Sequence, residues 1–483
     1  MSRIITKSIV YVVAVLFILL HGFLLLREGI QYLIFLPLLL LALFIAFVRL
    51  DNFLLLIVFL VPLSIPLYSF FSDLDVNLFL PSEPLIIIAF LIFLIKIIKS
   101  ERIDYKIFKH PVSIAIYINL AWILITALTS SMPVVSIKFF LSRFWFLVVF
   151  YFLTAELCKN YNFIKKYLWA YIIPLIIVIF YTIIRHTSIG LFDQDAAHYV
   201  MGPFFNDHTS YGAILAMVIP VIAGFTIDRT SRQGIRFLSL IILTIYIVAF
   251  ILSFSRAAWV SLIFAGGIFI IVVLRIRLWM VMLITLVVFY LAFSNLTEIV
   301  FRMGRNTQDS SARLAEHLQS ISNITNDYSN VERLNRWNCA MRMFGERPLF
   351  GWGPGTYMFK YAPYQISYQK TPISTEEGDR GNAHSEYLGP LSESGFIGSL
   401  SFLAIVIMTL ITGFSVYRKV KTKHMKILVL SLILGLITYF VHGIMNNFLD
   451  TDKASALFWG FTAMLVAVDI SYESVKTGNE NKD

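Results

Sequence analysis

Residues 237–254 read FLSLIILTIYIVAFILSF, a run without a charged side chain that is long enough to cross a bilayer as a helix. Apolar runs of about 17–25 residues, the length that a bilayer requires, recur along the whole chain. We count fourteen, at residues 8–26, 30–48, 53–71, 84–99, 111–129, 139–157, 167–185, 208–228, 237–254, 257–274, 278–295, 396–416, 427–446 and 454–470. This pattern predicts an all-α polytopic membrane protein with about 12–14 transmembrane helices.

The composition supports the same class and excludes others. Of the 483 residues, 58% are apolar and only 14% are charged, whereas soluble proteins carry about a quarter charged residues. An ordinary soluble enzyme, a disordered chain and a nucleic-acid-binding module are therefore excluded. On a membrane protein, the formal charge of +10 indicates basic cytoplasmic loops rather than a polyanionic partner.

The placement of the charges predicts an orientation. With the N-terminus inside, the tails and inner connections hold 23 of the 39 Lys and Arg residues, and the short outer connections hold six. The positive-inside rule then places both termini in the cytoplasm and residues 296–395 outside. The first apolar run is interpreted as a retained helix, because no small-residue cleavage site follows it. We expect four parts: N-terminal helices at 1–207, central helices at 208–295, a large outer loop at 296–395, and C-terminal helices with a short tail at 396–483.

The outer loop is where we expect chemistry. The apolar runs carry few ionisable residues near their centres, although ion-coupled transporters normally need them there. The loop has eleven acids and ten bases, and eight of the bases are Arg, which is suited to phosphate contacts. These arginines could also simply pair with the acids on a solvated face. A capping box at residues 329–332 predicts a helix over 331–344, with Arg333 and Arg336 on one flank.

Two further stretches of the loop are informative. The sequence PLFGWGPG at 348–355 predicts a turn whose backbone can approach another surface, either as a plain helix-ending loop or as a phosphate cradle. His384 follows later, and an imidazole near its ordinary pKa of about 6.5 can accept a proton at neutral pH. We therefore interpret His384 as a candidate general base. Glu386 and Glu393 could orient His384 or cap the helix that follows.

Three stretches in this order resemble the O-antigen ligase and polymerase superfamily, bacterial membrane glycosyltransferases that move glycans assembled on undecaprenyl pyrophosphate. They are SFSRAAW at 253–259, Arg333-Leu334 with Trp337 and PLFGWG at 348–353, and His384-Ser385 followed at the family's spacing by Gly395 and Gly398. Weaker support comes from GPFFN at 202–206 and from His442-Gly443 with Asn446-Asn447. The similarity covers roughly residues 200–470.

The resemblance implies a C-type glycosyltransferase-like fold with short helices in a periplasmic loop. It implies an inverting, metal-independent transfer of an undecaprenyl-pyrophosphate-linked polysaccharide to a lipid A-core sugar hydroxyl, without a cofactor. On this basis His384 is the catalytic base and Arg256 and Arg333, with Arg336 nearby, bind the pyrophosphate. The expected partners are the lipid-linked donor, a lipid A-core or glycan acceptor and membrane lipids, and no nucleic acid. The expected location is the bacterial inner membrane, with the active site facing the periplasm.

Alternative functions stay open at this point. The enzyme could be a polymerase that joins lipid-linked repeat units, or it could transfer the glycan to a protein hydroxyl. A polysaccharide transporter also fits the number of apolar runs. A divalent-cation site is conceivable from five residues with no recognised metal-binding spacing: His198, Asp207, His208, His442 and Asp450. The two cysteines, Cys158 and Cys339, are expected on opposite sides and allow no disulfide framework.

Overall fold

The computed structural model describes residues 44–69, 78–99, 104–277, 328–367 and 381–480, with a few single residues between them. Nine helices in this part are long and apolar enough to cross a membrane. They are α6 (Pro111–Leu128), α7 to α8 (Pro133–Cys158), α9 (Tyr161–Ile189), α11 (His208–Ile227), α12 (Gln233–Leu252), α13 (Arg256–Val273), α19 (Leu388–Lys419), α20 (Lys423–His442) and the Asp452–Tyr472 part of α21 (Asp452–Glu480). The all-α polytopic prediction is therefore confirmed. The expected runs at 8–26 and 278–295, and most of 30–48, lie outside the described residues.

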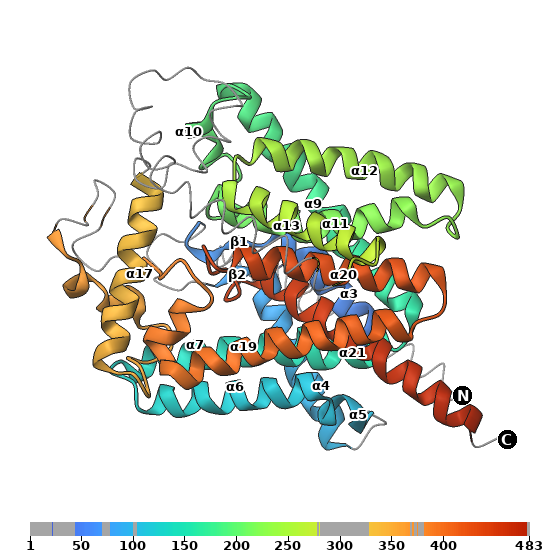
Figure 1. Cartoon of the computed structure of the whole chain (residues 1–483), viewed down its shortest axis with the longest axis horizontal. Helices are drawn as coiled ribbons and strands as arrows, with labels where there is room; N and C mark the ends of the chain where they lie inside the picture. Colours follow the sequence, from blue (N-terminus) through green and yellow to red (C-terminus); the bar gives the residue numbers. More distant parts are fainter. Residues whose placement is uncertain are drawn as a thin grey trace.

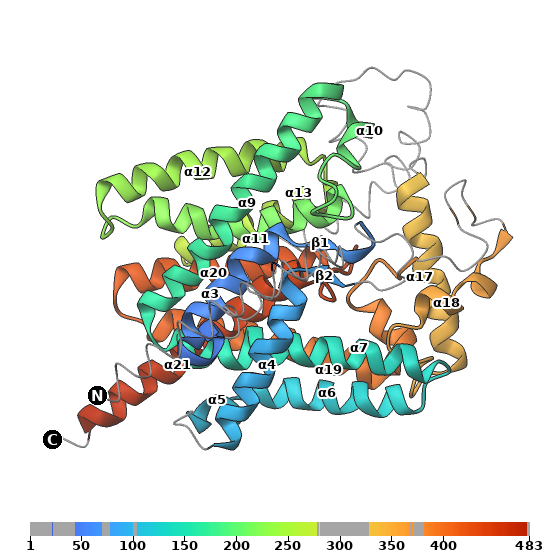
Figure 2. The same ribbon diagram turned by 180° about the vertical axis from the view of Figure 1, so that it is seen from behind.

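The long helices lie side by side with their axes roughly parallel, and α17 (Tyr328–Glu346) stands across one end of them (Figures 1 and 2). The short helix α10 (Gln194–Ala197) and the two-stranded sheet of β1 (Ile65–Pro66) and β2 (Phe79–Leu80) lie toward the same end. The last helix, α21, leaves the bundle at the opposite end. The bundle therefore has two distinct ends, and the described parts of the expected outer loop, residues 328–367 and 381–395, lie at the end marked by α17.

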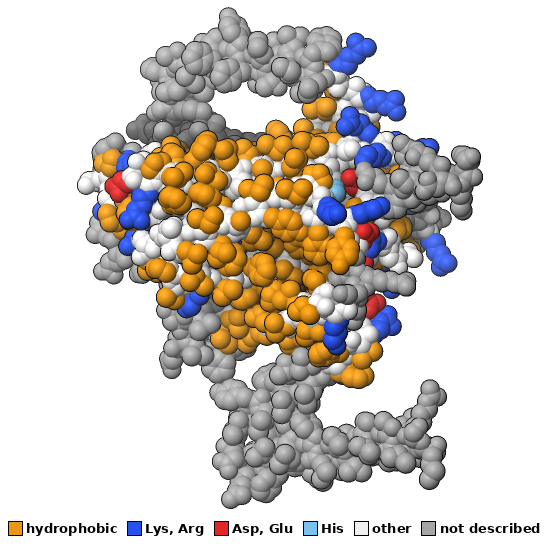
Figure 3. Space-filling view, turned by 90° about the horizontal axis from the view of Figure 1, so that it is seen from below, with side chains coloured by type: hydrophobic (Ala, Val, Ile, Leu, Met, Phe, Trp, Pro, Cys, Tyr) orange, Lys and Arg blue, Asp and Glu red, His pale blue; other side chains and the backbone are white. Residues whose placement is uncertain are grey.

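The centre of the bundle is formed by α11, α20 and α21. Within their apolar segments 78%, 72% and 89% of the residues are buried, against 28% for α12 and 22% for α13. Large apolar side chains of the outer helices are exposed instead, and one face shows them as a continuous band with Lys and Arg concentrated at one edge (Figure 3). An exposed apolar band of this extent fits contact with lipid rather than with water.

One expected span is interrupted. The run at 53–71 was predicted as a single helix, but the helix α3 (Leu50–Leu60) ends at Leu60, a 3₁₀ turn covers Val61–Leu63, and the chain then becomes extended in β1. Pro62 and Pro66 lie at the break, and each lacks the N–H group that a helix hydrogen bond needs. The chain leaves the helix here, whereas α9 and α11 continue through the single prolines Pro174 and Pro220. The chain returns through β2 into α4 (Ser82–Ile98), which matches the run expected at 84–99.

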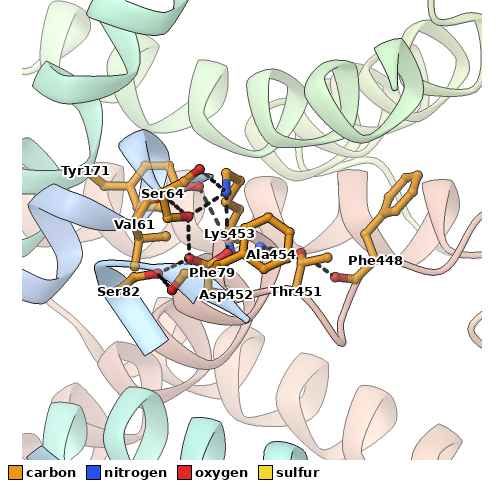
Figure 4. Close-up of polar contacts among 10 residues, drawn as sticks. All are labelled: Val61, Ser64, Phe79, Ser82, Tyr171, Phe448, Thr451, Asp452, Lys453 and Ala454. Carbon is orange, nitrogen blue, oxygen red and sulfur yellow. Dashed lines mark hydrogen bonds and ion pairs between the residues drawn. The ribbon is translucent and has the colours of Figure 1, made fainter. Parts of the chain in front are cut away.

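A buried polar cluster joins this hairpin to the start of α21 (Figure 4). The hydroxyl groups of Ser64 and Ser82 both donate to Oδ2 of Asp452, at 2.6 Å and 2.5 Å. The ammonium group of Lys453 donates to the hydroxyl oxygen of Ser64 at 2.6 Å and to its carbonyl oxygen at 3.1 Å. Asp452 and Lys453 are 0% and 3% exposed, so this Ser64–Ser82–Asp452–Lys453 cluster is an interior contact between segments far apart in the sequence.

Candidate active site

Arg256 is the first residue of α13 and follows directly on a compact corner that ends α12. The hydroxyl of Ser253 and the indole N–H of Trp259 both donate to the carbonyl oxygen of Phe250, at 2.7 Å and 3.3 Å. Phe254, in between, has a positive φ of 47°. The SFSRAAW stretch is therefore a hydrogen-bonded turn that fixes the position of Arg256 at the start of α13.

The helix expected over 331–344 is α17, and it is slightly longer, from Tyr328 to Glu346. Its buried face is mixed, and Leu334 and Met341 from the apolar positions are 39% and 48% exposed. The buried residues are Glu332, Asn335, Arg336, Cys339, Ala340 and Met343. The helix thus turns a charged pair toward the protein at one end of this face, and Cys339, Ala340 and Met343 pack in a small apolar cluster at the other.

Arg336 is fully engaged inside the protein. Its Nε lies 2.8 Å from Oε1 of Glu332, and its guanidinium carbon lies 4.8 Å from the centre of the Tyr361 ring. Its Nη1 also donates to the carbonyl oxygen of Asn382 at 3.4 Å. A Cβ atom on Gly381 would overlap the same nitrogen, so only glycine leaves room for this guanidinium. Arg336 therefore braces the segment that leads to His384.

His384 is held by its backbone in an unusual conformation. Its φ of 47° lies in the left-handed region, which non-glycine residues seldom adopt. Its N–H donates to Oδ1 of Asn382 at 3.0 Å, and its carbonyl oxygen accepts the indole N–H of Trp337 at 3.3 Å. Helix α17 is thus joined to the His384 backbone on both sides, through Trp337 directly and through Arg336 at Asn382. Local strain that is held in this way is common at functional sites.

The surroundings of His384 favour its neutral form. Burial, followed by the positive charges of Arg336 and Arg333, lowers the pKa of His384 to about 4, and Asp207 and a hydrogen bond with Asn446 oppose this effect in part. The imidazole is therefore uncharged at pH 7, which is the state that a general base requires. It also follows that Arg333 and Arg336 of α17 lie close to His384.

The structure gives Glu386 and Glu393 other partners than His384. Oε1 of Glu386 accepts hydrogen bonds from the hydroxyl of Tyr439 at 2.5 Å, and from the N–H groups of Phe448 at 2.9 Å and Leu449 at 2.8 Å. Oε1 of Glu393 accepts the N–H of Tyr357 at 2.9 Å. Both carboxylates hold loops in place. Neither of them caps α19, whose N-cap residue Tyr387 has no side-chain capping hydrogen bond. These contacts do not orient His384 directly.

The glycine-rich turn at 348–355 approaches another part of the protein closely, as predicted. Gly353 N–H donates to the carbonyl oxygen of Glu393 at 2.7 Å, and Phe396 N–H donates to that of Pro348 at 2.9 Å. A Cβ on Gly395, whose φ is +70°, would lie 2.1 Å from the carbonyl oxygen of Leu349. The turn thus packs into a kink of α19, which explains the glycine at position 395 structurally and favours a loop over a phosphate cradle.

Arg256 and Arg333 meet around a third residue, His208 at the start of α11. Both positive charges lie near enough to act on the His208 imidazole, and Asp207 next to it also faces His384. The ring of His198 lies 4.0 Å from that of His208, measured between centres. The structure therefore brings Arg256, Arg333, Arg336 and His384 together at one end of the bundle, although they come from three separate segments.

Asn446 and His442 also lie in the region of the candidate site, and sequence analysis did not place them there. Nδ2 of Asn446 lies 3.1 Å from Nε2 of His442, and the two residues are 2% and 1% exposed. The available signal was their position: both are polar residues at the end of an apolar run, where a side chain can face the outer loop. Sequence reasoning grouped His442 with the possible cation ligands, but the described residues contain no group of three or more His, Cys, Asp or Glu arranged to hold a metal ion.

Part of the chain is similar to a known protein family. Residues 237–403 match the family model described as O-antigen ligase, and the matched segment contains Arg256, Arg333 and His384. A search of curated proteins found no match. The family match confirms the resemblance to the O-antigen ligase and polymerase superfamily, and it supports a membrane glycosyltransferase of the ligase or polymerase type that uses lipid-linked glycans.

Proposed function

We propose that the α17 end of the bundle is the active site of an O-antigen ligase-type glycosyltransferase. The reaction moves a polysaccharide from undecaprenyl pyrophosphate to a sugar hydroxyl of lipid A-core, with inversion and without a metal ion. One observation carries the proposal: Arg333 of α17 acts on the buried, neutral imidazole of His384 and also on His208, where Arg256 of α13 acts too, and Arg256, Arg333 and His384 all lie in the segment that matches the O-antigen ligase family. This is the combination that departure of a pyrophosphate and activation of a hydroxyl require.

The proposed step is a single displacement at the anomeric carbon. The acceptor hydroxyl oxygen forms a bond to that carbon while the bond from the carbon to the phosphate oxygen breaks. The hydroxyl proton passes to His384, and the electron pair of the broken bond leaves with undecaprenyl pyrophosphate. Arg256 and Arg333 stabilise the negative charge that develops on the leaving oxygen, a contribution of about 10²–10³ in rate per such donor.

Donor binding also makes His384 a stronger base in this scheme. In the free enzyme, Arg333 and Arg336 help to lower the pKa of His384. A bound pyrophosphate places negative charge beside these arginines and offsets their field, so the pKa of His384 rises when the donor is present. Proton abstraction is then favoured only when there is a leaving group to expel.

Arg333 and Arg336 of α17 are assigned different roles. Arg336 is 5% exposed and is already occupied by Glu332, Tyr361 and Asn382, so we assign it to holding the His384 segment. Arg333 is only partly buried and acts on both His208 and His384, so we assign it to the pyrophosphate. Arg256, at the start of α13, provides the second phosphate contact.

The charges at the other end of the bundle support the orientation. The helices that start or end near the candidate site are connected at their far ends by basic segments. These contain Arg229 and Arg232 between α11 and α12 with Arg236 in the first turn of α12, and Lys421 between α19 and α20 with Arg418 and Lys419 at the end of α19 and Lys423 at the start of α20. The positive-inside rule places these connections in the cytoplasm. We therefore propose an inner-membrane protein with cytoplasmic termini and a periplasmic active site.

The test is a transfer assay with purified protein in detergent or nanodiscs. Undecaprenyl-pyrophosphate glycan is supplied with either lipid A-core or further lipid-linked repeats, with and without a chelator. We expect glycosylated core lipid to form in the presence of chelator. The product should be lost in His384→Ala but not in His424→Ala, a control at the far end of the bundle. Lengthened lipid-linked chains would move the assignment to a polymerase, and a requirement for added cation would refute the metal-free mechanism.

A further inference from the structure

The glycine-rich turn that follows α17 exposes two large apolar side chains, although its backbone is held on both sides. Leu349 is 51% exposed and Phe350 is 40% exposed. In the same turn, the carbonyl oxygen of Trp352 accepts the N–H of Ser131 at 3.0 Å, and the N–H of Trp352 donates to the carbonyl oxygen of Ser392 at 3.1 Å. The two exposed side chains are therefore presented by a backbone that is fixed to the rest of the protein.

Phe350 lies against the lipid-facing side of α6. Its ring stacks on that of Trp122, with 5.6 Å between the ring centres and 12° between the ring planes. Trp122 lies in a row of apolar side chains that recur every three or four residues, the spacing of one helix face. Helix α6 contains no charged residue, and the other members of this row are all exposed: Ile114, Ile118, Ile125 and Leu128. Such a row on a membrane-spanning helix fits contact with lipid.

A second lipid-facing row, on α19, begins at the same turn. The N–H of Phe396 donates to the carbonyl oxygen of Pro348 at 2.9 Å. The indole N–H of Trp122 donates to the carbonyl oxygen of Ser394 at 2.8 Å, so the two helices are neighbours where the turn meets them. The exposed row on α19 consists of Phe396, Leu400, Leu403, Ile407 and Ile411. The exposed side chains of the turn therefore continue a lipid-facing surface that two helices form.

The position of the Trp122–Phe350 stack along α6 indicates its depth in the bilayer. Trp122 lies six residues before Leu128, the last residue of α6, and this places the stack about 9 Å from the end of the helix at 1.5 Å per residue. With its 18 residues α6 is about 27 Å long, close to the roughly 30 Å thickness of the hydrocarbon core. The end of α6 therefore lies near the edge of the hydrocarbon layer, and the Phe350 ring lies inside that edge.

An exposed cation precedes the two apolar residues. The guanidinium carbon of Arg347 lies 4.1 Å from the centre of the Trp352 ring. Long basic side chains beside membrane-facing apolar residues place their charge among the lipid phosphates. An exposed apolar pair next to an exposed arginine thus has the charge pattern that suits a phospholipid surface.

We propose that Leu349 and Phe350 form a membrane anchor, which enters the acyl chains of the leaflet on the α17 side. The occupant of this surface is bilayer phospholipid, and the inference does not depend on the proposed reaction. It has a consequence for the candidate site, because the anchored turn leads directly out of α17 and packs into the kink of α19. Lipid contact then holds this end of α17 at the membrane, where a lipid-linked substrate arrives.

The test attaches a single nitroxide label to the full-length protein in nanodiscs of phosphatidylethanolamine and phosphatidylglycerol. Leu349→Cys and Phe350→Cys are compared with two labelled controls, which are also at exposed positions. Ile118→Cys lies in the apolar row of α6, and Phe359→Cys lies on α18 (Tyr357–Lys360), beyond α17 as seen from the bundle (Figures 1 and 2). Both native cysteines are buried, and the unsubstituted protein, treated with the same reagent, reports any signal from them.

Electron paramagnetic resonance then measures how strongly the label is relaxed by oxygen, which concentrates among acyl chains, and by a water-soluble nickel chelate. We expect the ratio of oxygen to nickel accessibility at positions 349 and 350 to be several-fold higher than at 359 and close to that at 118. A ratio equal to that at 359 would overturn the inference, because the turn would then lie in water. Low accessibility to both reagents would also overturn it, since another protein surface would then cover the turn. The measurement requires no glycan transfer, so its failure and the failure of the proposed function are separate results.

Discussion

On acidification, kcat and kcat/KM of glycan transfer should fall at two different pH values, which we call their acid limbs. The variant Arg333→Gln should move the acid limb of kcat/KM. The pKa of His384 is about 4 in the free protein, below its ordinary value of 6.5. Because the neutral imidazole is the active form, kcat/KM should fall as the pH drops through about 4, and kcat should fall at a higher pH, since bound pyrophosphate offsets the arginines. The wild-type enzyme therefore loses kcat before it loses kcat/KM on acidification.

The size of the change that Arg333→Gln should make in the pKa of His384 follows from the order of the effects that lower this pKa. Burial lowers the pKa of His384 most, Arg336 comes second and Arg333 third, so Arg333 accounts for less than a third of the total lowering. Its removal should raise the acid limb of kcat/KM by on the order of one pH unit, or about 1.4 kcal/mol. The same variant should also lose rate at pH 7, where the base is neutral, because a pyrophosphate contact is gone.

The assay is initial-rate transfer from undecaprenyl-pyrophosphate glycan between pH 3.5 and 8, with Arg418→Gln at the far end of α19 as the matched control. Arg418→Gln should leave both limbs in place. Coincident limbs of kcat and kcat/KM in the wild type, or an acid limb that Arg333→Gln leaves unchanged, would refute the reasoning that links these arginines to His384.

Three other variants probe separate parts of the account. Arg256→Ala should lower turnover by about 10²–10³-fold, measured in the same transfer assay, whereas Arg256→Lys should recover only part because a Lys cannot bind a phosphate through two nitrogens. Lys453→Met should lower the free energy of unfolding by about 3–5 kcal/mol, because Asp452 loses its buried cation. The melting temperature should fall accordingly, and Lys421→Met, at an exposed position, should leave it unchanged. Gly395→Ala should also lower the melting temperature, because a side chain at φ +70° meets the carbonyl oxygen of Leu349, and a melting curve identical to the wild type would contradict the packing described for this turn.

The membrane helices could be predicted from the sequence because a bilayer imposes one strong requirement. Backbone groups must be hydrogen-bonded within the segment, so an uncharged apolar run of sufficient length becomes a helix. The run at 111–129 is α6 (Pro111–Leu128), and the run at 208–228 is α11 (His208–Ile227). The same reasoning failed at 53–71, where two prolines outweighed the apolar composition.

The candidate site was harder to predict, because contacts across the chain decide it. The spacing of residues predicted the helix α17, but it did not predict that the helix buries Glu332 and Arg336, which form an ion pair inside the protein. The position of Arg256, Arg333 and His384 at one end followed from the topology. The surroundings that set the pKa of His384 did not, because they come from α17, from Asp207 and from Asn446, and no local pattern in the sequence encodes that arrangement.

A double-mutant cycle on transfer rate tests most directly whether the arginines and the imidazole form one site. Turnover is measured for Arg256→Ala, His384→Ala and the double variant, each with the melting temperature as a check on folding. Residues that act as a unit have strongly non-additive effects, so the double variant should be about as slow as the slower single variant. Losses that multiply, so that each substitution has its full effect in the presence of the other, would contradict a shared site.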